Sequence, residues 1–184
     1  VMDAVEAVER SIFESLALLK TSLDSYTCVL LWFDVGQQSL RIKELVSDSD
    51  AVVESALDPA LGVLGSIVRC REPVVLEDLR EGFRGLSYYR GSEPVRQFLG
   101  VPLIEDGHMR GILCVDRCTG PAFDAEEREV VEMVSESILR SVENERIFKD
   151  VEATKFELGQ FFNASRRLNS VLSMGEVLDA ALRS

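Results

Sequence analysis

The sequence predicts an α+β fold, in which an antiparallel sheet is combined with long helices. Apolar residues recur every three or four positions near both ends of the chain, as in amphipathic helices. Between them lie two segments, 26–46 and 98–117, in which short apolar stretches flank a turn, as in β-hairpins. With 184 residues, the chain is long enough for one ordinary domain and an extension.

The first predicted helix is followed directly by the first hairpin. Residues 26–34 (YTCVLLWFD) are apolar on both faces and rich in β-branched and aromatic types, so we expect this strand inside the sheet. The turn DVGQQS leads to the returning strand LRIKELV. The apolar positions that predict the helix, over about six turns, are Val5, Val8, Ile12, Leu16, Leu19 and Leu23.

The middle of the chain contains a second helix, a short strand and a long loop. Asp58 and Pro59 predict a helix start, with the Asp58 carboxylate as the N-cap and the proline at the first helical position. The helix ends before REP, and VVLED is a short strand. Residues 79–95 contain three glycines and two tyrosines without periodicity. A loop of this length in a compact domain is usually functional or mobile.

The second hairpin is FLGVPLIEDGHMRGILCVDR, residues 98–117, with Asp106-Gly107 as its turn. The chain's one histidine, His108, follows this turn, where we expect a solvated residue and neither a catalytic base nor a haem ligand. Strand alternation places one set of residues on a common face, with Asp116 where that face opens toward polar surroundings or solvent. This set is Phe98, Gly100, Pro102, Ile112, Cys114 and Asp116.

The last helix begins at a capping box formed by Asp124 and Glu127. No strong helix breaker follows before Leu172, and Gly159 lowers helix stability by only roughly 1 kcal/mol. Apolar residues from position 147 onward follow a heptad pattern, which predicts a coiled coil. With the wide apolar stripe of the first helix, it also predicts a parallel homodimer. The predicted dimer and signalling seam is Ile147, Val151, Leu158, Phe161, Leu168 and Leu172.

A second capping box, Ser173 with Glu176, predicts a fresh helix start near the end of the chain. We therefore expect three parts. They are a domain over residues 1–149, a coiled-coil signalling helix over 150–172, and the truncated start of a further domain over 173–184.

Three motifs in this order resemble the GAF domain family. LGVLGSIVRCREPVVLEDL (61–79) is similar to the family's helix and strand beside its pocket, the hairpin 98–117 to its central hairpin, and FDAEEREVVEMVSESI (123–138) to its closing helix. The resemblance implies a five- or six-stranded antiparallel sheet. It implies that the N- and C-terminal helices pack on one face, and that a ligand pocket lies on the other, under the irregular loop.

The resemblance also implies a function. GAF domains followed by a signalling helix act in bacterial signal transduction, including two-component and cyclic-di-GMP systems. This implies a cytoplasmic domain that senses an unknown small molecule, dimerises, or both. It would pass the signal to an output module of the histidine kinase, diguanylate cyclase or sigma-54 activator type. The implied ligand-binding residues are Phe83, Tyr88, Tyr89, Arg96, Phe98, Gly100, Cys114 and Asp116.

Cyclic-nucleotide-binding members of the family carry an Asn-Lys, Phe, Asp-Glu signature. Here Asp116-Arg117 stands where Asn-Lys would stand, Phe123 matches, and Glu127-Arg128 replaces Asp-Glu. This spacing permits an ion pair between Arg117 and Glu127, which we expect to be structural. The altered residues do not establish nucleotide binding.

Two alternatives to sensing stay open at this point. One is a redox enzyme of the free methionine sulfoxide reductase type. Its cysteines lie in the loop before the VPL strand, and residues 77–97 contain none here, so we expect no catalytic residues. The other is a ligand-free dimerisation scaffold, in which Phe83, Tyr88, Tyr89 and Phe98 fill the cavity themselves.

Composition excludes several partners. The net charge of −12 argues against binding to a nucleic-acid backbone. The longest apolar run, residues 28–33, is too short to cross a bilayer, and we expect no direct membrane contact. The four cysteines form no CxxC pair, and with a single histidine they predict no metal site. No cofactor is evident.

Overall fold

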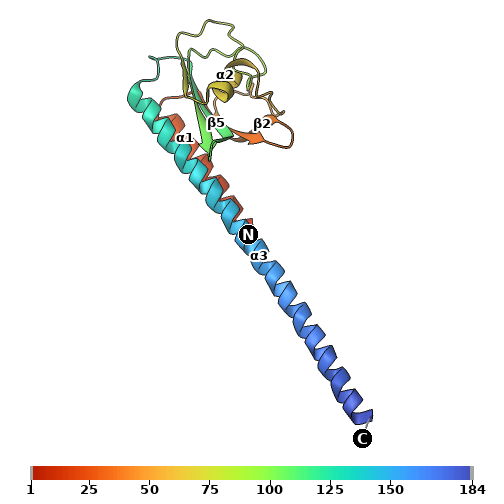
Figure 1. Cartoon of the computed structure of the whole chain (residues 1–184). Helices are drawn as coiled ribbons and strands as arrows, with labels where there is room; N and C mark the ends of the chain where they lie inside the picture. The colour runs from red at the N-terminus through yellow and green to blue at the C-terminus, as the bar shows by residue number, and fades with distance from the viewer. Residues whose placement is uncertain (1, 183–184) are drawn as a thin grey trace. The chain divides into compact units, whose positions relative to one another are not determined.

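The computed structural model describes the backbone of residues 2–182 and the side chains of residues 6–162 and 165–166. Helices and hairpins alternate as the sequence predicts, which confirms the α+β fold class (Figure 1). The helices are α1 (Met2–Ser22), α2 (Gly62–Cys70) and α3 (Ala125–Leu182). The strands are β1 (Thr27–Asp34), β2 (Ser39–Ser47), β3 (Val74–Leu76), β4 (Gln97–Glu105) and β5 (His108–Arg117).

The strands form one five-stranded antiparallel sheet in the order β2-β1-β5-β4-β3. β5 is the central strand, and β1 lies inside the sheet as its two apolar faces predict. The two edge strands, β2 and β3, come from different parts of the chain. The short strand β3 pairs with only three residues of β4. A residue on β5 is therefore placed between elements that are distant in the sequence.

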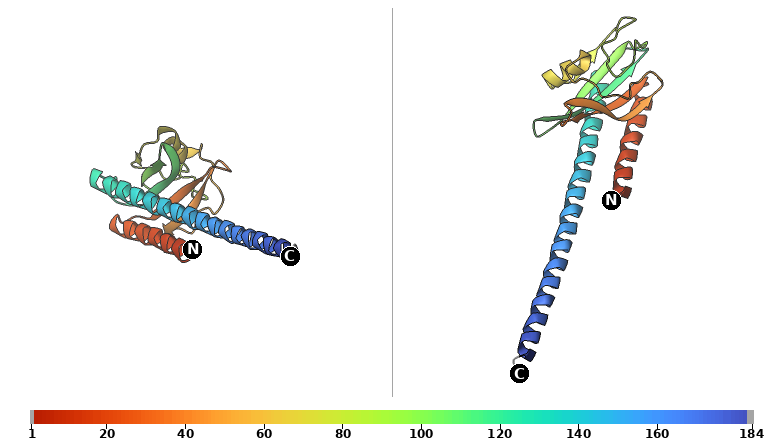
Figure 2. Two further views of the ribbon diagram at one scale, coloured as in Figure 1. Left: turned by 60° about the horizontal axis from the view of Figure 1, so that its bottom comes forward. Right: turned by 90° about the vertical axis from the view of Figure 1, so that its right-hand side faces the viewer.

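Different elements cover the two faces of the sheet (Figure 2). On one face, α1 and the first part of α3 bury Leu16 and Val131 against β1, β4 and β5. On the other face, α2 and the irregular segments bury Leu64 and Tyr88. This arrangement confirms that the terminal helices share one face, and leaves the opposite face to α2 and the loops.

The chain divides into two units, residues 2–142 and residues 143–182. The first holds the sheet, α1, α2 and the first part of α3, and the second holds the remainder of α3. The boundary expected at residue 149 stays a prediction. Within residues 2–182, no helix combines the length and the apolar character that crossing a membrane requires.

The predicted start of α2 is wrong by a few residues. Asp58 does not cap the helix; its Oδ1 accepts a hydrogen bond from the Ala60 backbone N–H at 2.8 Å and closes a local turn. The helix begins at Gly62, after Leu61, which contributes no side-chain cap. Aspartate in this position satisfies its own turn as readily as a helix start, and Pro59 is compatible with both.

The second capping box does not interrupt the backbone of α3, which continues through Ser173 to Leu182. A capping residue favours a helix start but does not stop a helix that already runs through it. The assignment of residues 173–184 to a further domain stays a prediction.

Candidate functional site

Asp116 lies near the end of β5, on the sheet face that α2 and the loop between β3 and β4 cover. Strand pairing places it opposite Phe98, and places Cys114 opposite Gly100. Its side chain is 0% exposed. Of the two surroundings expected for Asp116, solvent is therefore wrong, and the polar surroundings are hydroxyl groups of the protein itself. The loop covers the carboxylate completely.

Two tyrosine hydroxyls from that loop hold the carboxylate. Tyr88 donates a hydrogen bond to Asp116 Oδ2 at 2.6 Å, and the Tyr89 hydroxyl lies 2.8 Å from the same oxygen. The two rings pack against each other with centroids 4.6 Å apart. The other carboxylate oxygen, Oδ1, is buried and makes no hydrogen bond of normal geometry with the described residues, although the Thr27 backbone N–H lowers the pKa of the carboxyl. The structure thus gathers three of the predicted ligand-binding residues into one closed network.

The network continues to the strand pair β1 and β2. The Tyr89 hydroxyl lies 2.6 Å from Thr27 Oγ1, and Thr27 Oγ1 lies 2.6 Å from Ser47 Oγ. A tyrosine hydroxyl has one proton, so Tyr89 donates to only one neighbour at a time, and the carboxylate is the stronger acceptor. Thr27 and Ser47 are not among the predicted site residues, because hydroxyl residues at strand ends are common and have no distinctive spacing.

Burial raises the pKa of Asp116 from 3.8 to about 7, although hydrogen bonds from Tyr88, Tyr89 and the Thr27 backbone act in the opposite direction. The same burial, with the nearby carboxylate, raises the pKa of Tyr88 and of Tyr89 well above the usual value. Both phenols therefore remain protonated donors. The negative charge of Glu93 further raises the pKa of Asp116.

Backbone and side-chain contacts anchor the loop at both ends of the tyrosine pair. Residues 51–53 bind residues 88–90, with the Val53 N–H donating to Tyr88 O at 2.9 Å and the Arg90 N–H donating to Ala51 O at 2.8 Å. Glu93 accepts hydrogen bonds from the Tyr26 hydroxyl at 2.9 Å and from the Ser49 hydroxyl at 3.0 Å. The loop is therefore tied to the sheet and to the segment after β2.

The other predicted ligand-binding residues occupy mixed positions. Phe98 and Cys114 are fully buried in the same core as the tyrosines, and Phe83 is half-buried against it. Gly100 has a packing explanation, because a Cβ atom there would lie 2.4 Å from Ile67 Cδ1. Arg96 is exposed, and its guanidinium donates to the Leu79 carbonyl at 2.9 Å. Arg96 is thus part of the surface of the loop.

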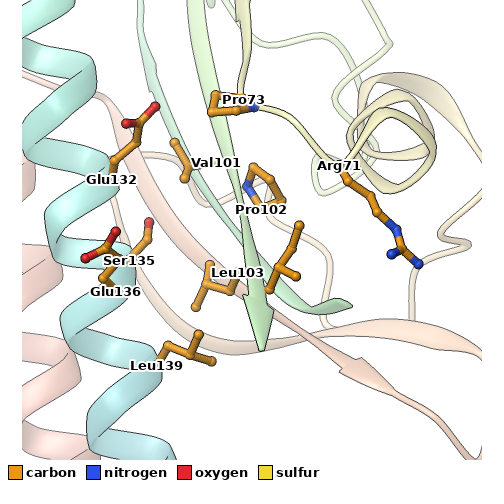
Figure 3. Close-up of a pocket in the computed structure, with 10 residues that line it drawn as sticks. Arg71, Pro73, Val101, Pro102, Leu103, Glu132, Ser135, Glu136 and Leu139 are labelled. Carbon is orange, nitrogen blue, oxygen red and sulfur yellow. The ribbon is translucent and has the colours of Figure 1, made fainter. Parts of the chain in front are cut away.

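Two grooves lie elsewhere on residues 2–142. One, of about 330 Å³, separates β4 from the first part of α3, with Val101 and Pro102 on the strand and Glu132 and Glu136 on the helix (Figure 3). The other, of about 390 Å³, lies between β2 and residues 49–54, with Arg90 at its rim. None of the predicted ligand-binding residues lines either groove.

Arg117, the residue after Asp116, joins the sheet to α3. Its Nη2 lies 2.6 Å from Glu127 Oε1, and its guanidinium stacks on the Phe123 ring at 4.0 Å. Glu127 in turn completes the predicted capping box, since its Oε2 accepts from the Asp124 N–H at 3.0 Å and its N–H donates to Asp124 Oδ1 at 2.8 Å. Arg117 thus contacts the residue that fixes the start of α3.

The predicted seam of α3 presents exposed apolar side chains. Ile147, Val151, Leu158 and Phe161 are all exposed, and so are Phe148, Phe156 and Phe162 at other heptad positions. Leu168 and Leu172 lie outside the residues whose side chains are described. The described part of the seam is available for a partner.

Burial disfavours the thiolate at three of the four cysteines, and the fourth, Cys70, is exposed. Cys28 and Cys114 are buried on opposite faces of the sheet, and burial raises the pKa of Cys28 to about 12 and that of Cys114 well above its usual value. Burial also raises the pKa of Cys118 to about 11. A reactive cysteine requires the thiolate, which these environments disfavour. In the described part of the chain, no three histidine, cysteine, aspartate or glutamate side chains are placed to hold a metal ion.

Several solved structures have a similar fold. The GAF domain of a phosphoenolpyruvate-protein phosphotransferase from Coxiella burnetii is 19% identical, with a TM-score of 0.65 over 78% of this chain and 86% of that one. The free methionine-R-sulfoxide reductase of Neisseria meningitidis is 18% identical, with a TM-score of 0.64 over 76% of this chain and 80% of that one. The GAF-B domain of DevS from Mycobacterium smegmatis is 18% identical, with a TM-score of 0.60 over 78% and 98%.

At these identities, the solved structures show a shared fold and do not transfer an activity. The family is shown by the sequence itself. Residues 8–143 match the GAF domain family, and this range holds the sheet, the Asp116 network and the start of α3. The chain belongs to the GAF domain family.

Proposed function

We propose that this chain is a dimerising sensory domain of a cytoplasmic bacterial signalling protein. A small molecule acts at the sheet face that the loop over Asp116 covers. The response passes through α3 to an output module of the histidine kinase, diguanylate cyclase or sigma-54 activator type.

The observation that carries the proposal is that α3 is buried on the sheet in its first part and exposes apolar side chains in its later part. In its first part, Val131 and Ile138 are buried against the sheet. In its later part, the same helix exposes apolar side chains at the seam positions. Exposed apolar residues at heptad spacing gain stability by packing against a second helix. A second copy of this chain offers the matching seam, so the helix that packs on the sheet also forms the dimer.

Replacing Phe161 with lysine is expected to weaken the dimer at least about tenfold, because two charged side chains enter the seam of each dimer. Sedimentation at micromolar concentration measures this as a shift from twice the chain mass toward the single mass. Phe156 provides the matched control. It is 68% exposed against 75% for Phe161, and it occupies an outer heptad position.

Phe156→Lys should leave the dimer intact. A wild-type monomer, or equal effects of the two substitutions, would refute a dimer through this seam.

Sensing is supported by the acceptor that the closed face retains. Asp116 Oδ1 is buried without a hydrogen bond of normal geometry, and a ligand with hydrogen-bond donors would bind it in the ionised form of the carboxyl. Native mass spectrometry of freshly purified protein is expected to show a retained small molecule in the wild type, and none in Tyr88→Phe with Asp116→Asn. An intact dimer that retains nothing, even from cell extract, would favour the ligand-free scaffold.

We further propose that the chain has no redox activity of its own. The raised thiol pKa values and the separation of Cys28 from Cys114 by the sheet support this. The similarity to the Neisseria reductase concerns the fold.

A further inference from the structure

Asp116 and Arg117 are consecutive residues at the end of the central strand, and their side chains leave opposite faces of the sheet. The Asp116 side chain joins the tyrosine core under the loop, whereas Arg117 stacks on Phe123 in the core beneath the helices. Both are almost completely buried. Because successive side chains of a strand point to opposite faces, a single peptide bond connects the core under the loop with the core under the terminal helices.

On the loop side, Asp116 is held by two tyrosine hydroxyls from a segment without helix or strand. Tyr88 and Tyr89 belong to the irregular segment between β3 and β4. Their hydroxyls supply the side-chain hydrogen bonds that Asp116 Oδ2 receives at 2.6 and 2.8 Å. Any event that moves this loop changes the surroundings of Asp116 first.

On the helix side, the contact is equally direct. Arg117 binds Glu127 at 2.6 Å, and its Nη1 lies 3.5 Å from the Pro121 carbonyl in the connection to α3. Glu127 and Asp124 hold the first turn of the helix through two reciprocal hydrogen bonds. A displacement of Arg117 therefore acts on the start of α3 and on the segment before it.

Backbone hydrogen bonds hold both residues in place on neighbouring segments. The Asp116 carbonyl accepts from the Tyr26 N–H at 2.8 Å, and the Arg117 carbonyl accepts from the Arg96 N–H at 2.9 Å. The peptide between the two residues is planar and rigid. A shift of the strand end at Asp116 therefore reaches Arg117 through one rigid peptide unit and the two dihedral angles beside it.

We propose that Asp116 and Arg117 form a coupling element, through which the state of the tyrosine loop controls the stability of the first turns of α3. The inference rests on the proposed function, since it supplies the route by which a ligand under the loop reaches the helix. With Tyr88 and Tyr89 bound, Asp116 is fixed and Arg117 holds Glu127. When they leave, the end of β5 relaxes and the first turns of α3 open more often.

The test is a double-mutant cycle with hydrogen exchange as its measurement. Tyr88→Phe removes one donor to Asp116 and keeps the ring, and Glu127→Gln weakens the contact of Arg117. We expect Tyr88→Phe to speed amide exchange in residues 125–132 by about threefold or more, the size typical of residues in one network. The increase should largely disappear in the Glu127→Gln background. Exchange in α1, which packs on the same face, reports on global unfolding, so the effect on α3 is counted as the increase in residues 125–132 beyond any increase in α1.

The matched control uses another arginine–glutamate pair on the same hairpin. Arg110 and Glu105 form an ion pair near its turn, at the opposite end of β5. In the Glu105→Gln background, the effect of Tyr88→Phe on α3 should persist. Should Tyr88→Phe not fold, Asp116→Asn serves as the loop-side variant with the same expected pattern.

Unchanged exchange in α3, or an equal fold-change with and without Glu127→Gln, overturns the coupling. The measurement lies within residues 2–142, so it stands independently of the dimer. A monomer in sedimentation would defeat the proposed function and leave this result in place.

Discussion

Replacing Asp116 with asparagine is expected to remove the loss of stability that this carboxyl causes between about pH 4 and pH 8. Burial raises the pKa of this carboxyl from 3.8 to about 7 in the folded protein. In that window the folded state retains a proton that the unfolded state has lost, so the free energy of unfolding falls as the pH rises. A rise of about three pKa units corresponds to roughly 4 kcal/mol, lost by about pH 8.

Asparagine keeps an oxygen acceptor for the two tyrosines and does not titrate. The difference between wild type and Asp116→Asn in urea unfolding at several pH values therefore isolates this carboxyl. The titratable groups near it are Tyr88, Tyr89 and Glu93 from the loop, Cys114 on its own strand and Cys118 just after that strand, and Cys28 lies on the opposite face of the sheet. The three thiols and the two phenols have pKa values raised by burial and titrate above the window. Parallel curves for the two proteins would show that Asp116 is solvated, and that the loop does not close over it.

The framework of the domain could be predicted because its determinants are local. The apolar strand 27–34, the Asp106-Gly107 turn and the Asp124–Glu127 capping box each specify their own structure within a few residues. Positive φ angles of 49° and 74° at Asp106 and Gly107 are what such a turn requires. These elements were correct because tertiary contacts reinforce what the local sequence already favours.

The surroundings of Asp116 could not be predicted in the same way. Its partners Tyr88 and Tyr89 are 28 and 27 positions away, in a segment without periodicity. Alternation placed Asp116 on the correct face, and the family resemblance placed the loop over that face, but neither predicted that the tyrosine hydroxyls bind the carboxylate. Asp58 shows the same limit on a smaller scale, since one hydrogen bond decides between a turn and a helix cap.

The sheet face opposite α1 and α3 is therefore closed by the loop between β3 and β4. A ligand that binds there must first displace this loop. The buried tyrosines match the alternative in which large side chains fill the cavity. They also leave a carboxylate whose burial is only partly compensated. A ligand that opens this face must bind the open state more tightly than the loop binds the closed one. The free energy with which the loop binds the closed face thus decides whether a ligand can open it, as a sensor requires, or not, as in a scaffold.

Truncating Tyr88 to alanine is expected to lower the free energy of unfolding by about 3 to 5 kcal/mol, because a fully buried aromatic ring is removed and a cavity remains. Tyr88→Phe removes only the hydrogen bond to the carboxylate and should cost about 1.5 to 3 kcal/mol. Arg84→Ala, at an exposed position of the same loop, should stay within about 0.5 kcal/mol. Urea unfolding at pH 7 measures all three.

A loss below about 1 kcal/mol for Tyr88→Ala would mean that the tyrosine leaves the core at little cost, as a mobile lid does. The loop would then open readily, and weak ligands would suffice to hold it open. The large loss that the buried contacts predict has the opposite consequence. Only a ligand that replaces both the packing of the ring and the donors to Asp116 can keep this face open.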